Sequence, residues 1–276
     1  KGFEPSEENI EKSVKNVLRE AGDLPLLSVV GHRVVHGGDK FFRPTLVNDK
    51  ILAEMEGLNH LAPLHNPYNL AGIRAMRSFL PEVPQIAVFD TAFYVDLPEV
   101  AKTYALPRDV TEKYKIRRYG FHGFSHKFLM EEAAKELGKK ISGINLITCH
   151  LGGGWSATAI KKGKPIDTSM GYTPMEGLVM MTRSGDLDPG VVVELLKKSS
   201  SHLGDEKCAD VYNLLNRESG IKGLSGESDY QELLKKASLG NPAAKLAFDV
   251  AVYRLVKYIG AYWAALEGRV DAIVFS

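Results

Sequence analysis

Two periods of apolar residues alternate along this chain, and their alternation predicts an α/β protein. The helical period, with capping residues at several starts, marks six segments: 6–22, 48–58, 66–76, 125–137, 188–196 and 241–266. Short continuous apolar runs predict buried strands at 26–30, 85–89, 144–149, 155–160 and 270–276. The polar or proline-containing stretches 95–119 and 199–206 are predicted to be irregular. We place a crossing between two domains near 90–96.

Two of the predicted strands, 144–149 and 155–160, flank Gly152, Gly153 and Gly154. This order predicts a hairpin whose tip carries almost no side chains. Backbone amides in such a turn can approach and hold an anion such as phosphate. Arg183 follows in a polar turn, and a guanidinium near a glycine turn suits phosphoryl transfer. An ordinary tight hairpin with a surface arginine is the equal alternative.

Two charged residues follow predicted strands. Arg33 lies just past the run 26–30 and Asp90 directly after the run 85–89. Ligands bind at the carboxyl ends of strands in open α/β sheets. A guanidinium there suits a carboxylate or a phosphate, and an acid there is often catalytic or linked to a metal. The alternatives are an arginine paired with an acid and an aspartate that caps the next loop.

Several histidines lie beside predicted turns. His122 stands in Gly-Phe-His-Gly, where packing explains it poorly, so we expect it to face a ligand. His65 comes just before the helix that Asn66 is predicted to cap, close to an end that attracts anions. The alternative is that His65 is a polar side chain with its hydrogen bonds satisfied inside the fold. Ser125 is predicted to cap the helix 125–137. The histidines show no metal-ligand spacing, which disfavours a metal hydrolase or structural zinc.

Composition narrows the class of protein. A chain of 276 residues with 44% hydrophobic and 25% charged residues is typical of a soluble globular protein with two compact units. A net charge of +1 gives no general attraction to nucleic acid or an anionic membrane. Cys149 is expected to be a small buried filler. With no membrane-length apolar run and no signal peptide, we expect a cytoplasmic protein.

Six motifs occur in a specific order. They are GHRVVHGG, APLHNP, VFDTAF, RRYGFHGFSH, HLGGG and DTSMGYTPMEGL with TRSGDLDP. Together they resemble the acetokinase family of acetate, propionate and butyrate kinases, and within it the acetate kinases most closely. The resemblance implies an actin-like (ASKHA) fold of two RNase H-like domains facing a cleft. We expect an acyl-substrate domain at 1–91 and a nucleotide-binding and dimerisation domain at 92–276. Both would be incomplete, with the family's metal-linked Asn and Glu falling outside this chain.

The resemblance also implies an activity: reversible, in-line transfer of the ATP γ-phosphoryl group to acetate, giving acetyl phosphate and ADP. Mg²⁺ or Mn²⁺ would be needed, and the protein would be a homodimer. The implied catalytic residues are Asp90, His122 and Arg183. The implied residues for the acyl substrate are Arg33, Val35, Leu64, His65, Phe121 and Pro174. The implied nucleotide-binding residues are His150, Leu151, Gly152, Gly153, Gly154, Asp229, Tyr230 and Gln231.

The chain departs from the family pattern in places. Gly153 replaces a usual Asn, Trp155 a usual small residue, Tyr94 a usual His and Gln231 a usual Arg. A propionate or butyrate kinase is an alternative, because the sequence does not fix the volume of the acyl pocket. A module that binds nucleotide or acyl phosphate without turnover is another. A carboxylate substrate is already ionised near neutral pH and needs no general base. We therefore expect Asp90 to position an arginine or a magnesium-bound water.

Overall fold

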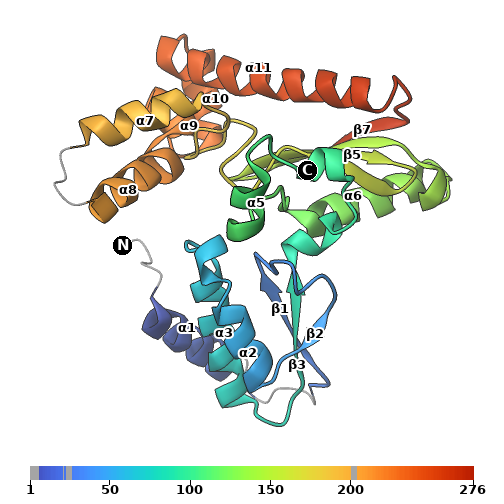
Figure 1. Ribbon diagram of the computed structural model, residues 1–276, viewed down its shortest axis with the longest axis vertical. Coiled ribbons are helices and arrows are strands. Elements are labelled where there is room, and N and C mark those ends of the chain that lie inside the picture. Colours follow the sequence, from blue (N-terminus) through green and yellow to red (C-terminus); the bar gives the residue numbers. More distant parts are fainter. Residues whose placement is uncertain (1–5, 21, 23–26, 200–203) are drawn as a thin grey trace. The chain divides into compact units, whose positions relative to one another are not determined.

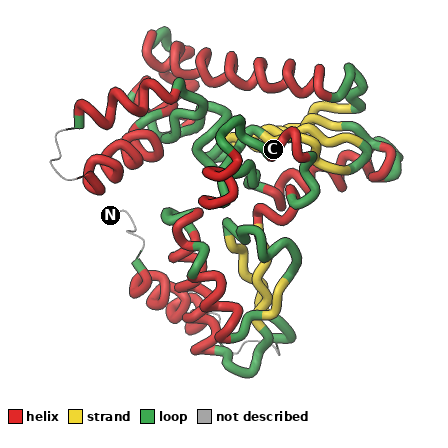
Figure 2. The backbone as a smooth tube through the Cα atoms, viewed as in Figure 1, coloured by secondary structure: helices red, strands yellow, loops and turns green. Residues whose placement is uncertain are grey.

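The computed structural model describes residues 6–20, 22, 27–199 and 204–276. It divides into two compact units, Lys1–Val95 and Asp96–Ser276, which run from blue to teal and from green to red (Figure 1). Each unit contains a small sheet with helices packed beside it (Figure 2). Within the described part of the chain, no helix is long and apolar enough to cross a membrane.

The first unit is built around a three-stranded sheet of order β1-β3-β2. Its elements are α1 (Glu7–Glu20), β1 (Val30–Val34), β2 (Thr45–Leu46), α2 (Asp49–Glu56), η1 (Asn59–Leu61), α3 (Asn66–Phe79), β3 (Gln85–Phe89) and η2 (Asp90–Tyr94). β1 and β3 are parallel, with Val34 opposite Phe89, and β2 is antiparallel to β3. The core includes Met55, Leu70 and Ile73 from α2 and α3, as the helical period predicted.

The first strand differs from the prediction. The run 26–30 was expected to be the strand, but β1 begins at Val30 and continues through Arg33; Leu26 lies outside the described residues. Arg33 is therefore inside the strand, opposite Val88, and not past its end. β1 is an edge strand whose exposure alternates. An edge position tolerates Gly31 and His32, which in sequence resemble a loop.

The second unit contains a four-stranded sheet of order β6-β5-β4-β7. Its strands are β4 (Leu146–Leu151), β5 (Trp155–Lys161), β6 (Lys164–Thr168) and β7 (Ala272–Phe275). Its helices are α4 (Glu99–Lys102), α5 (Arg108–Tyr114), α6 (Gly123–Glu136), η3 (Ile141–Gly143), α7 (Pro189–Lys198), α8 (Gly204–Asn213), η4 (Leu214–Glu218), α9 (Gly220–Ser225), α10 (Tyr230–Ser238) and α11 (Pro242–Ala265). β4 pairs antiparallel with β5 and parallel with β7. In Figure 1, α11 lies above this sheet and α6 below it, and both helices contact β4.

Local sequence signals determine much of this unit. The side chains of Asp188 and Asn241 accept hydrogen bonds from the backbone N of Gly190 and Ala244, and so cap α7 and α11 as predicted. Cys149 is buried in β4 and unbonded to another cysteine, also as predicted.

The two stretches predicted to be irregular contain helices. Segment 95–119 holds α4 and α5, each preceded by a proline at the N-cap position. These prolines, Pro98 and Pro107, start helices where we had expected them to prevent regular structure. In segment 199–206, residues 200–203 lie outside the described part, but α8 begins at Gly204 with Asp205 and Glu206 in its first turn. Acidic residues in a first turn stabilise a helix.

Candidate functional site

Arg33 and Asp90 form an ion pair in the first unit. Because β1 and β3 are parallel, their carboxyl ends, which carry Arg33 and Asp90, lie side by side. The Nε of Arg33 donates to Asp90 Oδ1 at 3.0 Å, and its Nη2 contacts Oδ2. The Asp90 side chain is only 2% exposed, whereas that of Arg33 is 58% exposed. The hydrogen bond to Asp90 raises the pKa of Arg33 above its ordinary value. The result is a fixed cation with an accessible face.

The turn after β1 is held by side chains from two other elements. Asn66, at the start of α3, accepts from the backbone N of His36 and donates to its carbonyl O, each at 3.0 Å. Asn69 accepts from Val35 N at 3.0 Å. Thr91, just after β3, accepts from Gly37 N at 3.1 Å. Val35, which follows β1 on this turn, is thereby fixed beside the strand end that carries Arg33.

Asn66 does not cap α3, and so this prediction is wrong. The N-cap residue is His65, whose side chain makes no capping bond, while Asn66 is fully buried and bonds to the backbone of His36. The proline after Asn66 marks the start of the helix. Nothing in the local sequence indicates the distant partner, which lies 30 residues away. Leu64 and His65 are partly buried at this helix start.

In the second unit, the glycine turn joins β4 to β5 as predicted, with Leu151 opposite Trp155. At two of the three glycines, side chains of other residues occupy the space that a Cβ atom would need. A Cβ at Gly154 would lie 3.2 Å from His122 Cε1 and 3.3 Å from Arg183 Nη1. A Cβ at Gly152 would lie 3.0 Å from His150 Nε2. Gly153 has no atom within 4 Å of its Cβ position, so the turn is open at this residue.

Two histidines are held beside this turn by serine hydroxyl groups. The rings of His122 and His150 lie 4.3 Å apart between centroids. Nδ1 of His122 is 2.8 Å from Ser156 Oγ, and Nδ1 of His150 is 2.9 Å from Ser125 Oγ. His122 has a positive φ of 58° at the N-cap of α6, a conformation uncommon outside glycine. This unusual backbone agrees with our expectation that packing alone does not explain His122.

Ser125 does not cap α6, which corrects a second capping prediction. The helix begins at Gly123, so Ser125 lies within its first turn. Its hydroxyl group bonds instead to His150, which is 25 residues away. The polar residues Ser125 and Ser156 were both missed as site residues. The available signal for Ser156 was a hydroxyl side chain within a run that was predicted to be a buried strand.

Arg183 is partly buried against backbone of its own unit. Its Nη1 donates to the carbonyl O of Pro174 at 2.8 Å. The neighbouring Thr182 donates to Asn216 O at 2.8 Å, which fastens this turn to η4. Burial lowers the pKa of Arg183 below its ordinary value. A cation that is partly desolvated in this way interacts more strongly with an anion.

The segment Asp229–Gln231 starts α10 next to the hairpin. Asp229 Oδ1 accepts from the backbone N of Gln231 at 2.8 Å and so caps the helix. The ring of Tyr230 stacks on Trp155, with centroids 5.6 Å apart and an interplanar angle of 17°. Trp155 is the first residue after the glycine turn and is 6% exposed. The stack therefore holds the start of α10 close to this turn.

The structure thus places the predicted residues in two groups, each within one unit. The first group comprises Arg33, Val35, Leu64, His65 and Asp90. The second comprises Phe121, His122, His150, Leu151, Gly152, Gly153, Gly154, Pro174, Arg183, Asp229, Tyr230 and Gln231. In the second group, the side chains of His122 and Arg183 meet at Gly154. Such a donor and cation beside an open glycine turn can bind and neutralise a phosphate.

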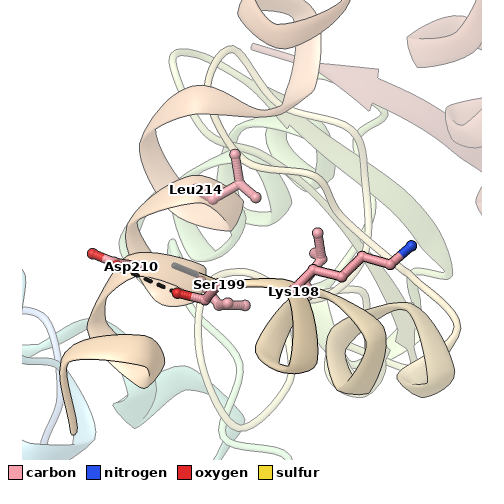
Figure 3. Close-up of a pocket in the computed structure, with 6 residues that line it drawn as sticks. Lys198, Ser199, Asp210 and Leu214 are labelled. Atoms are coloured by element: carbon pink, nitrogen blue, oxygen red, sulfur yellow. Dashed lines mark hydrogen bonds between the residues drawn. The ribbon is translucent and has the colours of Figure 1, made fainter. Parts of the chain in front are cut away.

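Two cavities of the second unit are lined by other residues, although one of them includes Thr173, Met175 and Ser184, the chain neighbours of Pro174 and Arg183. One of about 730 Å³ is lined mainly by apolar side chains, including Leu106, Tyr172, Val192 and Leu215. Another of about 330 Å³ lies between α7 and α8, where Ser199 Oγ is 3.4 Å from Asp210 Oδ2 (Figure 3). Neither contains a predicted site residue.

The described residues were also compared with the requirements of a metal site. Among the residues that the structure describes, no group of three or more His, Cys, Asp or Glu side chains could hold a metal ion. Asp90, the acid expected to act near a metal, is paired with Arg33. These residues do not by themselves fit a resident Mg²⁺ ion, and we derive no step through one.

Comparison with known proteins assigns the chain to one family. Residues 5–276 match the model of the Acetokinase family, and the chain belongs to that family. It is 52% identical over 254 residues to "Acetate kinase" of Helicobacter acinonychis, covering 92% of this chain and 62% of the relative. It is 47% identical over 272 residues to "Acetate kinase" of Streptomyces coelicolor, covering 96% and 65%. The chain thus spans less than two thirds of the length of these relatives.

Solved structures agree with this family. The acetate kinase of Porphyromonas gingivalis superposes with a TM-score of 0.86 at 42% identity, covering 95% of this chain and 67% of the other. A propionate kinase of Francisella tularensis superposes with a TM-score of 0.88 at 40% identity, covering 96% and 67%. The family resemblance and the mixed α/β fold expected from the sequence are confirmed.

Proposed function

We propose that the protein to which this chain belongs transfers the γ-phosphoryl group of ATP to acetate, reversibly giving acetyl phosphate and ADP. The observation that carries this proposal is the meeting of His122 and Arg183 at Gly154 of the hairpin. The names of the relatives in Helicobacter and Streptomyces support it.

In this proposal the glycine turn binds the phosphates of ATP. Amides of Gly152, Gly153 and Gly154 approach the anion, because these residues carry no side chain to exclude it. The open space at Gly153 supports this assignment. His150 and Leu151 precede the turn on β4. The segment Asp229–Gln231, held near the turn by the stack on Trp155, borders the adenosine.

The acyl carboxylate binds the exposed face of Arg33. A guanidinium can hold a carboxylate through two parallel hydrogen bonds, and Asp90 keeps the arginine in a fixed position. The other residues proposed to contact the acyl substrate are Val35, Leu64 and His65 of the first unit and Phe121 and Pro174 of the second.

Catalysis rests on alignment and on neutralisation of charge. The acetate oxygen attacks the γ-phosphorus while the bond to the ADP oxygen breaks in line with it. No proton has to be removed from the nucleophile. Arg183 and His122 stabilise the charge on the transferring group, and an arginine in such a role contributes about 10³- to 10⁵-fold to the rate.

Other properties expected from the sequence are part of the same proposal. They are ATP with Mg²⁺ or Mn²⁺, the homodimeric state, the cytoplasmic location, and the actin-like arrangement of two RNase H-like domains as an acyl-substrate domain and a nucleotide domain. A crystal structure with ADP and acetate would test the arrangement. Light scattering of the purified protein would test the dimer.

The activity is tested by trapping acyl phosphate with hydroxylamine in a mixture of ATP, Mg²⁺ and acetate. We expect product from the natural protein and a loss of about 10³-fold or more in kcat for Arg183→Ala, with a smaller change in the KM for acetate. Arg217→Ala, which removes an exposed arginine of the same unit, is the control and should keep its activity. ATP binding without any acyl phosphate would instead support a ligand-binding module.

A second candidate is a propionate kinase, because the Francisella structure is as similar to this chain as the Porphyromonas one. One methylene group changes transition-state binding by only about 1–3 kcal/mol in an apolar pocket. Comparing kcat/KM for acetate, propionate and butyrate decides between them. Acetate should give the highest value, and a higher value for propionate or butyrate would reassign the substrate.

A further inference from the structure

A chain of four polar side chains runs from the interior of the second unit to His122. His126 lies one helical turn after His122 on α6 and is fully buried. Its Nδ1 is 2.8 Å from Thr148 Oγ1 on β4, and its Nε2 is 2.8 Å from Ser156 Oγ on β5. Ser156 Oγ is in turn 2.8 Å from Nδ1 of His122. Thr148 and Ser156 are also fully buried.

The direction of the hydrogen bonds follows from the buried end of this chain. Within the described residues, the Thr148 hydroxyl group has one partner, Nδ1 of His126. A buried hydroxyl proton without an acceptor costs about 1–3 kcal/mol. Thr148 therefore donates, and Nδ1 of His126 accepts.

This direction also fixes the protons of His126 and Ser156. Because Nδ1 of His126 accepts, a neutral His126 carries its proton on Nε2 and donates it to Ser156 Oγ. Burial supports the neutral form, since it lowers the pKa of His126 to about 3. Among the residues that the structure describes, the Ser156 hydroxyl group has two partners, both histidines. It accepts from His126 and so donates to Nδ1 of His122.

We propose that Thr148, His126 and Ser156 are positioning residues that hold His122 in the tautomer with its proton on Nε2. This nitrogen adjoins Cε1, the ring atom that lies closest to the Cβ position of Gly154. The inference rests on the proposed function, because phosphoryl oxygens are acceptors and need a donor. A bare lone pair on Nε2 would repel the anion.

A second proton on His122 would reverse every hydrogen bond in this series of four side chains. Nδ1 of His122 would then donate to Ser156, Ser156 to His126, and His126 to Thr148. The Thr148 proton would be left without its acceptor in the described part of the chain. The hydrogen-bond series thus favours a neutral His122 that donates from Nε2, beside the charge of Arg183.

The first test needs no variant and no turnover. Nitrogen-15 NMR of histidine-labelled protein at about pH 8, where an ordinary imidazole is neutral, reports which ring nitrogen carries the proton. We expect Nε2–H at both His122 and His126. A main population of Nδ1–H at either residue would overturn the proposal, whether or not the protein is active.

A matched pair of variants tests the link itself. Ser156→Ala removes the hydroxyl group that joins the two histidines, and we expect both tautomers of His122 to appear. The kcat for phosphoryl transfer should fall by about 10- to 100-fold, with little change in the KM for acetate. Thr158→Val removes a buried hydroxyl group two residues along β5, which donates to Thr168 Oγ1. It should change neither readout.

His126→Gln provides a rescue, since its amide N–H can replace the Nε2–H that donates to Ser156. This variant should keep the Nε2–H tautomer of His122 better than His126→Leu does. An unchanged tautomer of His122 in both Ser156→Ala and His126→Leu would contradict a positioning role. If the natural protein shows Nε2–H but produces no acyl phosphate, the tautomer inference stands and the proposed function fails.

Discussion

Arg33 and Asp90 lie side by side at the carboxyl ends of two parallel strands, and Nε of Arg33 donates to Oδ1 of Asp90 at 3.0 Å. The acid is buried and the base is exposed. The buried Asp90 therefore holds the guanidinium of Arg33 in place, and the other face of the guanidinium is open to an anion. This agrees with our expectation that Asp90 positions an arginine.

Asp90→Asn should reduce kcat/KM for acetate by roughly 10- to 100-fold, since a hydrogen bond to a charged group contributes about 1.5–3 kcal/mol. Because no proton is abstracted, activity should not recover at high pH. A pH profile of kcat/KM measures this, with Asp96→Asn, an exposed acid, as the control. Full recovery at alkaline pH would identify Asp90 as a general base.

Gly154→Ala should disturb the phosphate site, because its methyl group would meet His122 and Arg183 at 3.2–3.3 Å. Displacing these groups by a fraction of an ångström should lower kcat by about tenfold or more. Gly143→Ala is the matched control, as its Cβ would also meet no atom within 4 Å and the residue lies in η3, outside the glycine turn. Equal losses in the two variants would contradict the role of space at Gly154.

Asn66→Ala should destabilise the first unit. It leaves the buried N–H and C=O of His36 without their partner, and each such group costs about 1–3 kcal/mol. Asn69→Ala, which removes one bond to Val35, should cost less. Urea unfolding measures the free energy of unfolding of both variants. A loss for Asn66→Ala that is equal to or smaller than that for Asn69→Ala would contradict the role of Asn66 in holding the His36 backbone.

His126 should make stability depend on pH. Burial, with a smaller contribution from His150, lowers the pKa of His126 to about 3 in the folded protein, against about 6.5 in an unfolded chain. Below pH 6.5 the unfolded state therefore binds more protons. The free energy of unfolding should fall by about 1.4 kcal/mol per pH unit between about pH 6.5 and 3; above pH 6.5 this contribution is complete.

The matched measurement compares urea unfolding of the natural protein with that of His126→Gln at several pH values. The difference between their slopes should correspond to about one proton. An NMR titration of His126 in the natural protein gives the same answer without a variant. Protonation of His126 near pH 6.5 in the folded state would refute the prediction.

Trp155 should report nucleotide binding, because it directly follows the glycine turn and stacks on Tyr230. The chain has 2 tryptophans, so Trp263→Phe leaves Trp155 as the single emitter. ADP should change the emission of this variant but not of Trp155→Phe with Trp263 retained. A response only from Trp263 would place the nucleotide elsewhere.

The sequence predicted those features that depend on neighbours along the chain. The hairpin around Gly152–Gly154 and the helices capped by Asp188 and Asn241 follow from local periodicity and turn chemistry. β1 was misplaced because Gly31 and His32 pair with β3, more than fifty residues away in the chain. Pro98 and Pro107 suggest irregular structure in the sequence, yet each occupies the N-cap position of a helix.

The sequence motifs supplied the candidate site residues but not the residues that hold them in place. Arg33, His122 and Arg183 lie in recognisable motifs. Their supporting partners are distant in sequence: Ser156 is 34 residues from His122, and Arg33 is 57 from Asp90. Local patterns assigned Asn66 and Ser125 to helix caps, whereas tertiary contacts use both side chains elsewhere.

Under the proposed function, the turn after β1 has a consequence for substrate selection. Three successive backbone amides, those of Val35, His36 and Gly37, are each held by a side chain from another element. Such a backbone cannot yield to a longer acyl group without breaking several buried hydrogen bonds. Selection among short fatty acids would therefore be steric, and changing it would require a new side-chain volume at a position such as Val35 while the main chain stays in place.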